Sequence, residues 1–228
     1  YPARLVTIAI SDVPGDDPSA IGSGPTVPDP TTLADARAIV AKYKLDLPDA
    51  VTRALNDAKN ESPKPGDAIF AGSAFALAAR PADSLQAAQA RVRAAGYDCI
   101  SLGGNVEGEA REVAAAHAKL ARDVRAQGKR AVILSGGELT VTIRGQGRGG
   151  TNQDYALALA IAHDGMPAVA ALAGDTDGTD GGAGSAADPA GAFVDGGTAA
   201  RGKALGLDPA AFLSQNNSTG FFEALGDL

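Results

Sequence analysis

The sequence predicts an α/β fold with mostly parallel sheets flanked by helices. Two observations carry this prediction. Short apolar runs alternate with amphipathic helical stretches along the 228 residues, which is the pattern of βα units. The chain is 45% hydrophobic but only 4% aromatic and has no Trp, so Ala, Val, Leu and Ile must build the core. These aliphatic side chains suit helices packed tightly on a parallel sheet.

The first half of the chain has the spacing of regular βα units, interrupted by a linker-like segment at 60–67. Thr32 closely follows Pro30 and can start a helix, while Gly96 and Gly128 stand where two helices should end. The predicted strands of this half are 5–10, 68–71 and 98–102. Its predicted helices are 32–43, 49–56, 83–95 and 107–126.

The second half contains the densest glycine and aspartate clusters of the chain. This change of composition near Gly128 predicts a boundary between an α/β segment at 1–128 and a second one at 129–228. Asp208 before Pro209 is a helix start signal. The predicted strands of this half are 131–134, 140–143, 168–172 and 192–195. Its predicted helices are 152–163, 198–205 and 209–213.

Charge and rare residue types exclude several classes of protein. A formal net charge of −7 argues against a nucleic-acid partner, although it permits a local basic pocket for an anionic ligand. Cys99 is the only cysteine, which excludes an internal disulfide and Cys-rich metal sites. No apolar run has the length of a membrane span and no leader is recognisable, so we expect no membrane partner and a cytoplasmic location.

The first candidate site is the loop at 10–32, which directly follows a predicted strand. Open α/β sheets place ligands at the carboxyl ends of their strands. Asp12 and Asp16 can position a metal or a polar substrate, and the amides around Ser23 and Gly24 can bind an anion. We assign these four residues to substrate binding. The alternative is a proline-stiffened loop with solvated acids.

The second candidate site is the segment 135–153, whose glycines at 145–150 satisfy G-x-G-x-x-G ahead of a predicted helix. Backbone N–H groups at a helix start favour an anion, and Arg144 and Arg148 add positive charge, so the pattern predicts phosphate binding. The alternative is a tight turn that needs glycine. The residues assigned to cofactor binding are Gly136, Gly137, Gly145, Gly147, Gly149, Gly150 and Asn152.

Two other nucleotide-binding patterns do not fit this segment. A Rossmann dinucleotide site needs an acid about 20 residues beyond its glycines, at the end of the next strand. Asp164 stands at a predicted helix end, and the acid after the next strand, Asp175, comes too late. The sequence also has no G-x-x-x-x-G-K-[ST] segment. The pattern therefore favours phosphate binding without a dinucleotide or an ordinary P-loop.

The third candidate site is the glycine-rich turn at 172–184. Asp175, Asp177 and Asp180 crowd three carboxylates there, and their mutual repulsion costs energy unless a cation offsets it. Mg²⁺ fits that need, whereas the spacing is wrong for a calcium-binding EF-hand. We assign all three aspartates to a Mg²⁺ site, and Asp175 and Asp177 also to catalysis. A solvated acidic turn is the alternative.

Together and in this order, the three loops resemble the glycerate 2-kinase family, also labelled hydroxypyruvate reductase, whose carboxyl-terminal part is the MOFRL domain. The resemblance covers nearly the whole chain. The family has two α/β domains with the active site in the cleft between them. This implies that 1–128 continue the amino-terminal kinase domain and that 129–228 are a MOFRL-like domain truncated at its end. The matching stretches are ISDVPGDDPSAIGSGPTVPDPTT, NVEGEAREVA, LSGGELTVTIRGQGRGGTNQ, GDTDGTDGG and GAFVDGGT.

The resemblance implies an enzyme that transfers the γ-phosphoryl group of ATP to D-glycerate or a similar hydroxy acid. One essential basic residue of the family is a lysine that we expect outside this chain, so the chain alone should have little kinase activity. The other is an arginine near the glycine loop, for which Arg148 is the candidate. The family commonly has G-R-G-G-R-N-Q, whereas Thr151 replaces the second arginine here, and the loss of a catalytic arginine would impair transfer.

The sequence leaves three matters open. It does not decide which loop meets ATP and which meets glycerate. Two alternative functions stand beside the kinase: a nicotinamide-dependent hydroxypyruvate reductase and a non-catalytic nucleotide-binding fragment. It is compatible with both a monomer and a homo-oligomer.

Overall fold

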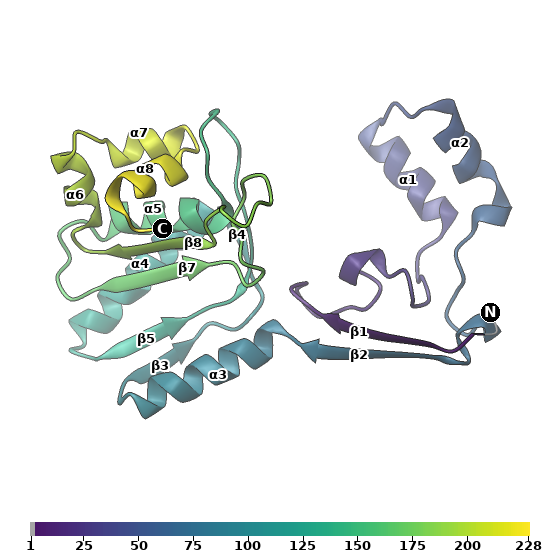
Figure 1. Ribbon diagram of the computed structural model, residues 1–228, viewed down its shortest axis with the longest axis horizontal. Helices are drawn as coiled ribbons and strands as arrows, with labels where there is room; N and C mark the ends of the chain where they lie inside the picture. Colours follow the sequence, from purple (N-terminus) through teal and green to yellow (C-terminus); the bar gives the residue numbers. More distant parts are fainter. Residues whose placement is uncertain (1–2) are drawn as a thin grey trace. The chain divides into compact units, whose positions relative to one another are not determined.

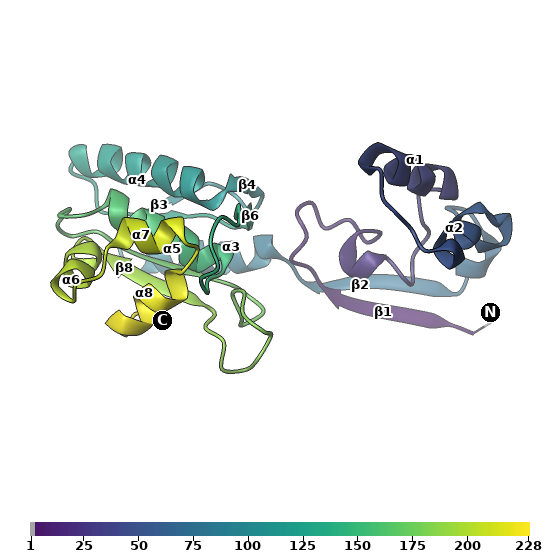
Figure 2. The same ribbon diagram turned by 90° about the horizontal axis from the view of Figure 1, so that it is seen from above.

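The computed structural model describes residues 3–228, whose contacts divide into two compact units between Pro81 and Ala82 (Figures 1 and 2). We call the described residues up to Pro81 unit 1 and residues 82–228 unit 2. The boundary expected at 128/129 from composition lies inside unit 2, between helix α4 (Ala110–Ala126) and strand β5 (Ala131–Leu134). None of the helices within 3–228 combines the length and the apolar character that crossing a membrane requires.

Unit 1 contains a parallel two-stranded sheet, a pair of helices and short 3-10 turns (Figure 1). Thr32 begins the first helix through a capping box: its hydroxyl accepts from the Asp35 N–H, and the Asp35 carboxylate accepts from the Thr32 N–H. The helix start predicted at this threonine is confirmed. The elements are β1 (Leu5–Ile10), η1 (Ile21–Ser23), α1 (Leu33–Tyr43), α2 (Asp49–Asn56), η2 (Ala58–Asn60), η3 (Ala68–Phe70) and β2 (Ser73–Ala79).

Unit 2 contains two parallel strand pairs, β3–β5 and β4–β6, and one antiparallel pair, β7–β8. The strands are therefore mostly parallel and flanked by helices, as the sequence predicts. The elements are α3 (Pro81–Ala94), β3 (Asp98–Ser101), β4 (Val106–Glu109), α4, β5, β6 (Gly137–Thr140), α5 (Thr151–Ala162), β7 (Ala170–Gly174), β8 (Gly191–Asp195), α6 (Thr198–Ala204), α7 (Pro209–Ser214) and α8 (Ser218–Leu225).

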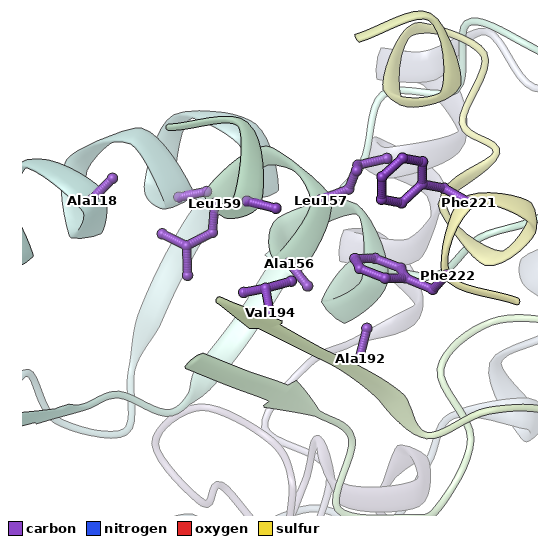
Figure 3. Packing of buried hydrophobic residues seen from close by; sticks show 10 residues of the cluster. Ala118, Ala156, Leu157, Leu159, Ala192, Val194, Phe221 and Phe222 are labelled. Atoms are coloured by element: carbon purple, nitrogen blue, oxygen red, sulfur yellow. The ribbon is translucent and has the colours of Figure 1, made fainter. Parts of the chain in front are cut away.

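The core of unit 2 surrounds α5, which is buried on several sides by α4, β8 and α8 (Figure 3). Leu157 of α5 lies beside Phe221 of α8, and Val194 of β8 lies near Ala156 on another side of α5, all of them buried (Figure 3). Phe221 and Phe222 meet edge to face with ring centroids 5.5 Å apart. Alanine is the usual core residue of α4, and its small side chain lets that helix approach α5 closely. The aliphatic core expected from composition is confirmed, with two phenylalanines added from α8.

Two predicted strands lie elsewhere in the structure. The strand predicted at 68–71 is wrong, because those residues form the 3-10 turn η3 and β2 follows it. Side chains along β2 alternate between half-buried and exposed, a period that the alanine-rich sequence hides. The strand predicted at 140–143 lies three residues earlier, at Gly137–Thr140, because β6 pairs with β4 over those residues.

Two helices also differ from prediction. The helix predicted at 107–126 begins at Ala110, because the residues before it form β4 and pair with β6. Helix α8 was not predicted. Its two phenylalanines are fully buried, and the core that buries them comes from elements far away in the sequence. Both differences arise from tertiary pairing that overrides the local pattern.

Candidate functional site

The glycine loop, residues 144–150, lies against a second segment, residues 215–219, which we call the asparagine segment. The Gly147 N–H donates to the Gln215 carbonyl at 3.0 Å, and the Thr219 N–H donates to the Arg148 carbonyl at 2.9 Å. The Arg148 N–H donates to Oδ1 of Asn217 at 3.2 Å. Several backbone N–H and C=O groups of the glycine loop therefore make hydrogen bonds within the chain.

The glycines of the loop allow this close approach. A Cβ atom at Gly147 would lie 2.6 Å from Cα of Asn217 and 2.7 Å from the carbonyl oxygen of Gln215. No real side chain fits at such distances, so glycine here serves backbone packing. The other three glycines of the loop are similarly crowded: Gly145 faces Gln215, Gly149 faces Ser218 and Gly150 faces Asp180.

The start of α5 carries an anion, and that anion is Asp180 of the same chain. Its Oδ1 accepts from the Asn152 N–H at 2.9 Å, and its Oδ2 accepts from the Gln153 N–H at 2.8 Å. The carboxylate is only 3% exposed and also receives the Asn152 side-chain amide at 3.2 Å. A carboxylate at this position is favoured by the free N–H groups and by the helix dipole. These two amides of α5 are therefore already engaged.

A buried polar network continues from this cap. Asp154 is 1% exposed and accepts from the Ser218 hydroxyl at 2.8 Å, from Nη2 of Arg111 at 3.2 Å and from Nδ2 of Asn216 at 3.3 Å. Gln153, also buried, donates to the Asp180 carbonyl and accepts from the Thr219 hydroxyl. Three donors compensate the buried charge of Asp154, which fixes the asparagine segment on the first turn of α5.

The two arginines of the loop point their charges outward. The Arg148 side chain is 68% exposed, and its Nη2 donates to Oε2 of Glu223 on α8 at 2.5 Å. This hydrogen bond raises the pKa of the Arg148 guanidinium above its ordinary value. Arg144 is exposed, and no side-chain partner of it is found among residues 3–228. The loop thus presents two positively charged side chains, and hydrogen bonds hold the backbone at both arginines.

The three aspartates of the turn after β7 differ in their exposure to solvent. Asp175 and Asp177 are exposed, whereas Asp180 is buried beneath α5. Oδ1 of Asp175 accepts from the Asp177 N–H at 3.3 Å, and partial burial together with the neighbouring carboxylates raises the pKa of Asp175. Within residues 3–228 no three acidic, histidine or cysteine side chains converge as a metal cluster. Two carboxylates of this turn, those of Asp175 and Asp177, are therefore accessible at the surface.

The Gly136–Gly137 pair forms hydrogen bonds with residues outside the glycine loop. The Gly136 N–H donates to the Gly103 carbonyl at 2.9 Å, and the Val106 N–H donates to the Gly136 carbonyl at 3.0 Å. A Cβ at Gly137 would overlap the backbone of Val106, and its φ of +146° is open to glycine only. Both glycines therefore make the close contact between β4 and the start of β6.

Unit 1 contains a cavity of about 820 Å³ beside the first candidate loop. Ser23 and Gly24 line it, whereas Asp12 and Asp16 do not. Asp29 also lines the cavity, and hydrogen bonds from the hydroxyls of Ser62 and then Thr31 lower its pKa to about 2. Hydroxyl groups and the Asp29 carboxylate form the polar part of the cavity wall, and apolar side chains such as those of Ile69 and Phe70 form the rest.

Asp12 and Asp16 lie on the turn that follows β1. Asp12 is exposed, and Asp16 takes a left-handed conformation with φ of +56°. In the part of the chain that the structure describes, no donor reaches Oδ1 of Asp16, although that atom is buried. Their assignment to substrate stays a prediction.

Sequence reasoning missed several residues that build the site. Asp29 lies in the predicted loop, but its acid was not singled out among the prolines. Asp154 was hidden inside a predicted helix, where a buried carboxylate looks like any surface acid. Asn216 and Asn217 form the only adjacent asparagine pair in the sequence, which is the one signal that could have found them.

Comparison with known proteins supports a common origin along the whole chain. The MOFRL family matches residues 131–228, and a domain of unknown function, DUF4147, matches residues 1–56. A relative from Agrobacterium vitis, named "Putative hydroxypyruvate reductase", is 48% identical over all of this chain and 51% of its own length. The D-glycerate 2-kinase of Thermotoga maritima is 33% identical over all of this chain and 53% of its own length.

The solved structures agree with the sequence matches. The crystal structure of the Thermotoga maritima glycerate kinase superimposes with a TM-score of 0.80 over 99% of this chain and 53% of that chain. The chain spans about half the length of the curated relatives that it matches. With the motifs, the fold and the sequence matches in agreement, the chain is similar to glycerate 2-kinases over its whole length, and residues 131–228 match the MOFRL family.

Proposed function

We propose that this chain forms part of an ATP-dependent kinase that phosphorylates the 2-hydroxyl of D-glycerate. In that reaction the hydroxyl oxygen bonds to the γ-phosphorus, the bond to the β-phosphate oxygen breaks, and the hydroxyl proton leaves. The observation that carries the proposal is the match to Thermotoga maritima D-glycerate 2-kinase, in sequence and in fold, over the whole chain.

The chemistry of this transfer suits the residues of unit 2. Phosphoryl transfer requires mainly positioning of the groups and neutralisation of the phosphate charge. Arg144 and Arg148 present positive charge from a loop whose backbone is fixed by hydrogen bonds. The amides of Asn152 and Gln153 are engaged by Asp180, so these arginines, rather than the start of α5, are the better candidates for phosphate contact.

Mg²⁺ fits the aspartate turn with two protein ligands. This ion is usually bound by one or two carboxylates together with phosphate oxygens and water. Asp175 and Asp177 are exposed and can supply them, while Asp180 holds the turn to α5. When bound, Mg²⁺ would neutralise part of the phosphate charge. We therefore assign Mg²⁺ to Asp175 and Asp177, with Asp180 in a supporting position.

Replacing Asp175 by asparagine should raise the Mg²⁺ concentration needed for half-maximal nucleotide binding by about tenfold, because one carboxylate ligand loses its charge. Titration of Mg²⁺ at fixed ATP measures the shift. Asp188→Asn is the matched control: its Oδ2 accepts from the Ala183 and Ser185 N–H groups within the loop. An unchanged Mg²⁺ midpoint in Asp175→Asn would place the ion elsewhere.

The substrate side is assigned to the cavity of unit 1. D-glycerate offers two hydroxyls and a carboxylate, and the cavity offers the hydroxyls of Ser23 and Ser62 and the backbone around Gly24. Arg4 lines the same cavity and can face the substrate carboxylate. These features support, for unit 1, binding of a small hydroxy acid.

The proposal is tested by measuring ADP release with D-glycerate and Mg²⁺-ATP and by identifying the product. The assay is run on this chain and on any longer protein that carries it. Arg148→Ala in an active form should lower kcat by about a thousandfold, because an arginine that stabilises transferring phosphoryl charge contributes on that order. Glu223→Gln, which removes only the charge of the side chain that pairs with Arg148, should change kcat far less. If no folded preparation releases ADP with D-glycerate and Mg²⁺-ATP, the proposal is rejected.

Reduction of hydroxypyruvate is the second candidate function, because the Agrobacterium vitis relative carries that name. Oxidation of a reduced nicotinamide cofactor by hydroxypyruvate, monitored by absorbance in the same preparations, separates the two reactions. A nucleotide-binding protein without turnover would bind ATP in calorimetry and fail both assays.

A further inference from the structure

Two neighbouring asparagines hold the glycine loop at the two positions where its arginines stand. Oδ1 of Asn216 accepts from the Arg144 N–H at 2.7 Å and from the Gly145 N–H at 3.1 Å. Oδ1 of Asn217 accepts from the Arg148 N–H at 3.2 Å. Side-chain carbonyls thus add to the backbone hydrogen bonds between the loop and the asparagine segment.

Asn216 is itself firmly anchored. Its Nδ2 donates to the Thr142 carbonyl and to Oδ2 of Asp154, each at 3.3 Å. It is 5% exposed, and its φ of +51° is a conformation that asparagine tolerates better than most residues. Asp154 in turn is held by Arg111 and Ser218. The clamp on the loop therefore rests on the buried Asp154 of α5 and on the partly buried Arg111 of α4.

The arginine side chains leave this clamp on the solvent side. Arg148 is largely exposed and is steered by Glu223, while Arg144 is exposed without a side-chain partner in the described residues. When such a guanidinium meets an anion, only its side chain has to be ordered, because the backbone is already fixed. The backbone positions from which the two accessible charges project are therefore preorganised.

We propose that Asn216 and Asn217 are positioning residues for Arg144 and Arg148. They set the spacing and direction from which the two guanidinium groups meet a polyphosphate, and they touch no ligand themselves. The proposal rests on the proposed function only in taking that polyphosphate to be ATP. No contact of a ligand with the amides at the start of α5 is required, because Asp180 occupies them.

The test is a double-mutant cycle between Asn217 and Arg148. Asn217→Ala removes the acceptor from the Arg148 N–H, and it should weaken binding of inorganic tripolyphosphate and of ATP about three- to tenfold. In the Arg148→Ala background the same change should have no further effect, because the asparagine acts through that arginine. An equal loss in both backgrounds would overturn the proposal, and so would a protein that binds neither anion.

Two further variants separate positioning from folding. Asn217→Asp keeps an acceptor oxygen, so the Arg148 amide should stay protected in hydrogen exchange. In Asn217→Ala that protection should be lost. Asn217 is the N-cap residue of α8, although its side chain makes no capping hydrogen bond. Asn217→Ser keeps a residue type that is favoured at this position but is too short to reach the loop, so the variant should fold and should bind anions as weakly as Asn217→Ala. Full anion affinity in a folded Asn217→Ser protein would contradict the proposal.

The outcomes also distinguish this proposal from the proposed function. If D-glycerate is not phosphorylated but the cycle with tripolyphosphate shows coupling between Asn217 and Arg148, the kinase assignment fails and the positioning role stands. If D-glycerate is phosphorylated but kcat/KM falls equally in both backgrounds, the kinase assignment stands and the positioning role fails.

Discussion

Gly147→Ala should lower the free energy of unfolding of unit 2 by about 2 to 3 kcal/mol, the cost of overpacking a closely packed contact. The added methyl group would lie 2.6 Å from Cα of Asn217 and 2.7 Å from the Gln215 carbonyl oxygen, so the loop and the asparagine segment would have to separate. The Gly147 hydrogen bond to Gln215 would be lost with that movement. Denaturant unfolding followed by circular dichroism measures the change.

Gly174→Ala is the matched control for this experiment. A Cβ at Gly174 would lie 3.6 Å from the Ala190 carbonyl oxygen, an ordinary contact distance, so this variant should unfold like the wild type. Wild-type stability of Gly147→Ala combined with lost anion binding would mean that the glycine faces a ligand rather than the asparagine segment. The two variants thus decide between the tight-turn and the phosphate-binding interpretations of the glycine pattern.

Asp154→Ala should destabilise unit 2 by about 3 kcal/mol, because it removes the acceptor from three donors at once. Arg111 would keep a partly buried charge without its carboxylate, and the Ser218 hydroxyl and the Asn216 amide would lose a partner. The asparagine segment should then loosen from α5. We expect faster hydrogen exchange at the Arg144 amide, measured together with the unfolding free energy.

Asp123→Ala removes a carboxylate of similar type from an exposed ion pair on α4. Asp123 lies 2.8 Å from Lys119, with both side chains mostly exposed, so its loss should cost about 0.5 kcal/mol or less. If both aspartate variants were equally stable, the network around Asp154 would contribute no more than a surface pair. Asp154→Asn should fall between them, because it keeps the shape but not the charge.

Local patterns were sufficient for several elements of this protein. The strand at 131–134 and the helix at 49–56 have the predicted bounds, and Thr32 caps the first helix as predicted. Apolar periodicity and capping residues act over a few neighbouring positions, so they can be read directly. The same locality explains the failures: β2 and β6 took their registers from pairing partners, and α8 took its stability from a distant core.

Sequence patterns were enough to predict the α/β class, to locate the three glycine- and aspartate-rich loops and to reveal the resemblance to glycerate 2-kinases. What those loops contact became visible in the folded chain alone. A glycine pattern states that a side chain is absent, but the atoms that fill the space come from Gln215 to Ser218 or from Asp180. Likewise, three aspartates in one turn look equivalent, yet Asp180 alone is buried under α5 and caps it. The physical reason is that backbone preference is local, whereas the partner of a loop is chosen by packing between distant segments.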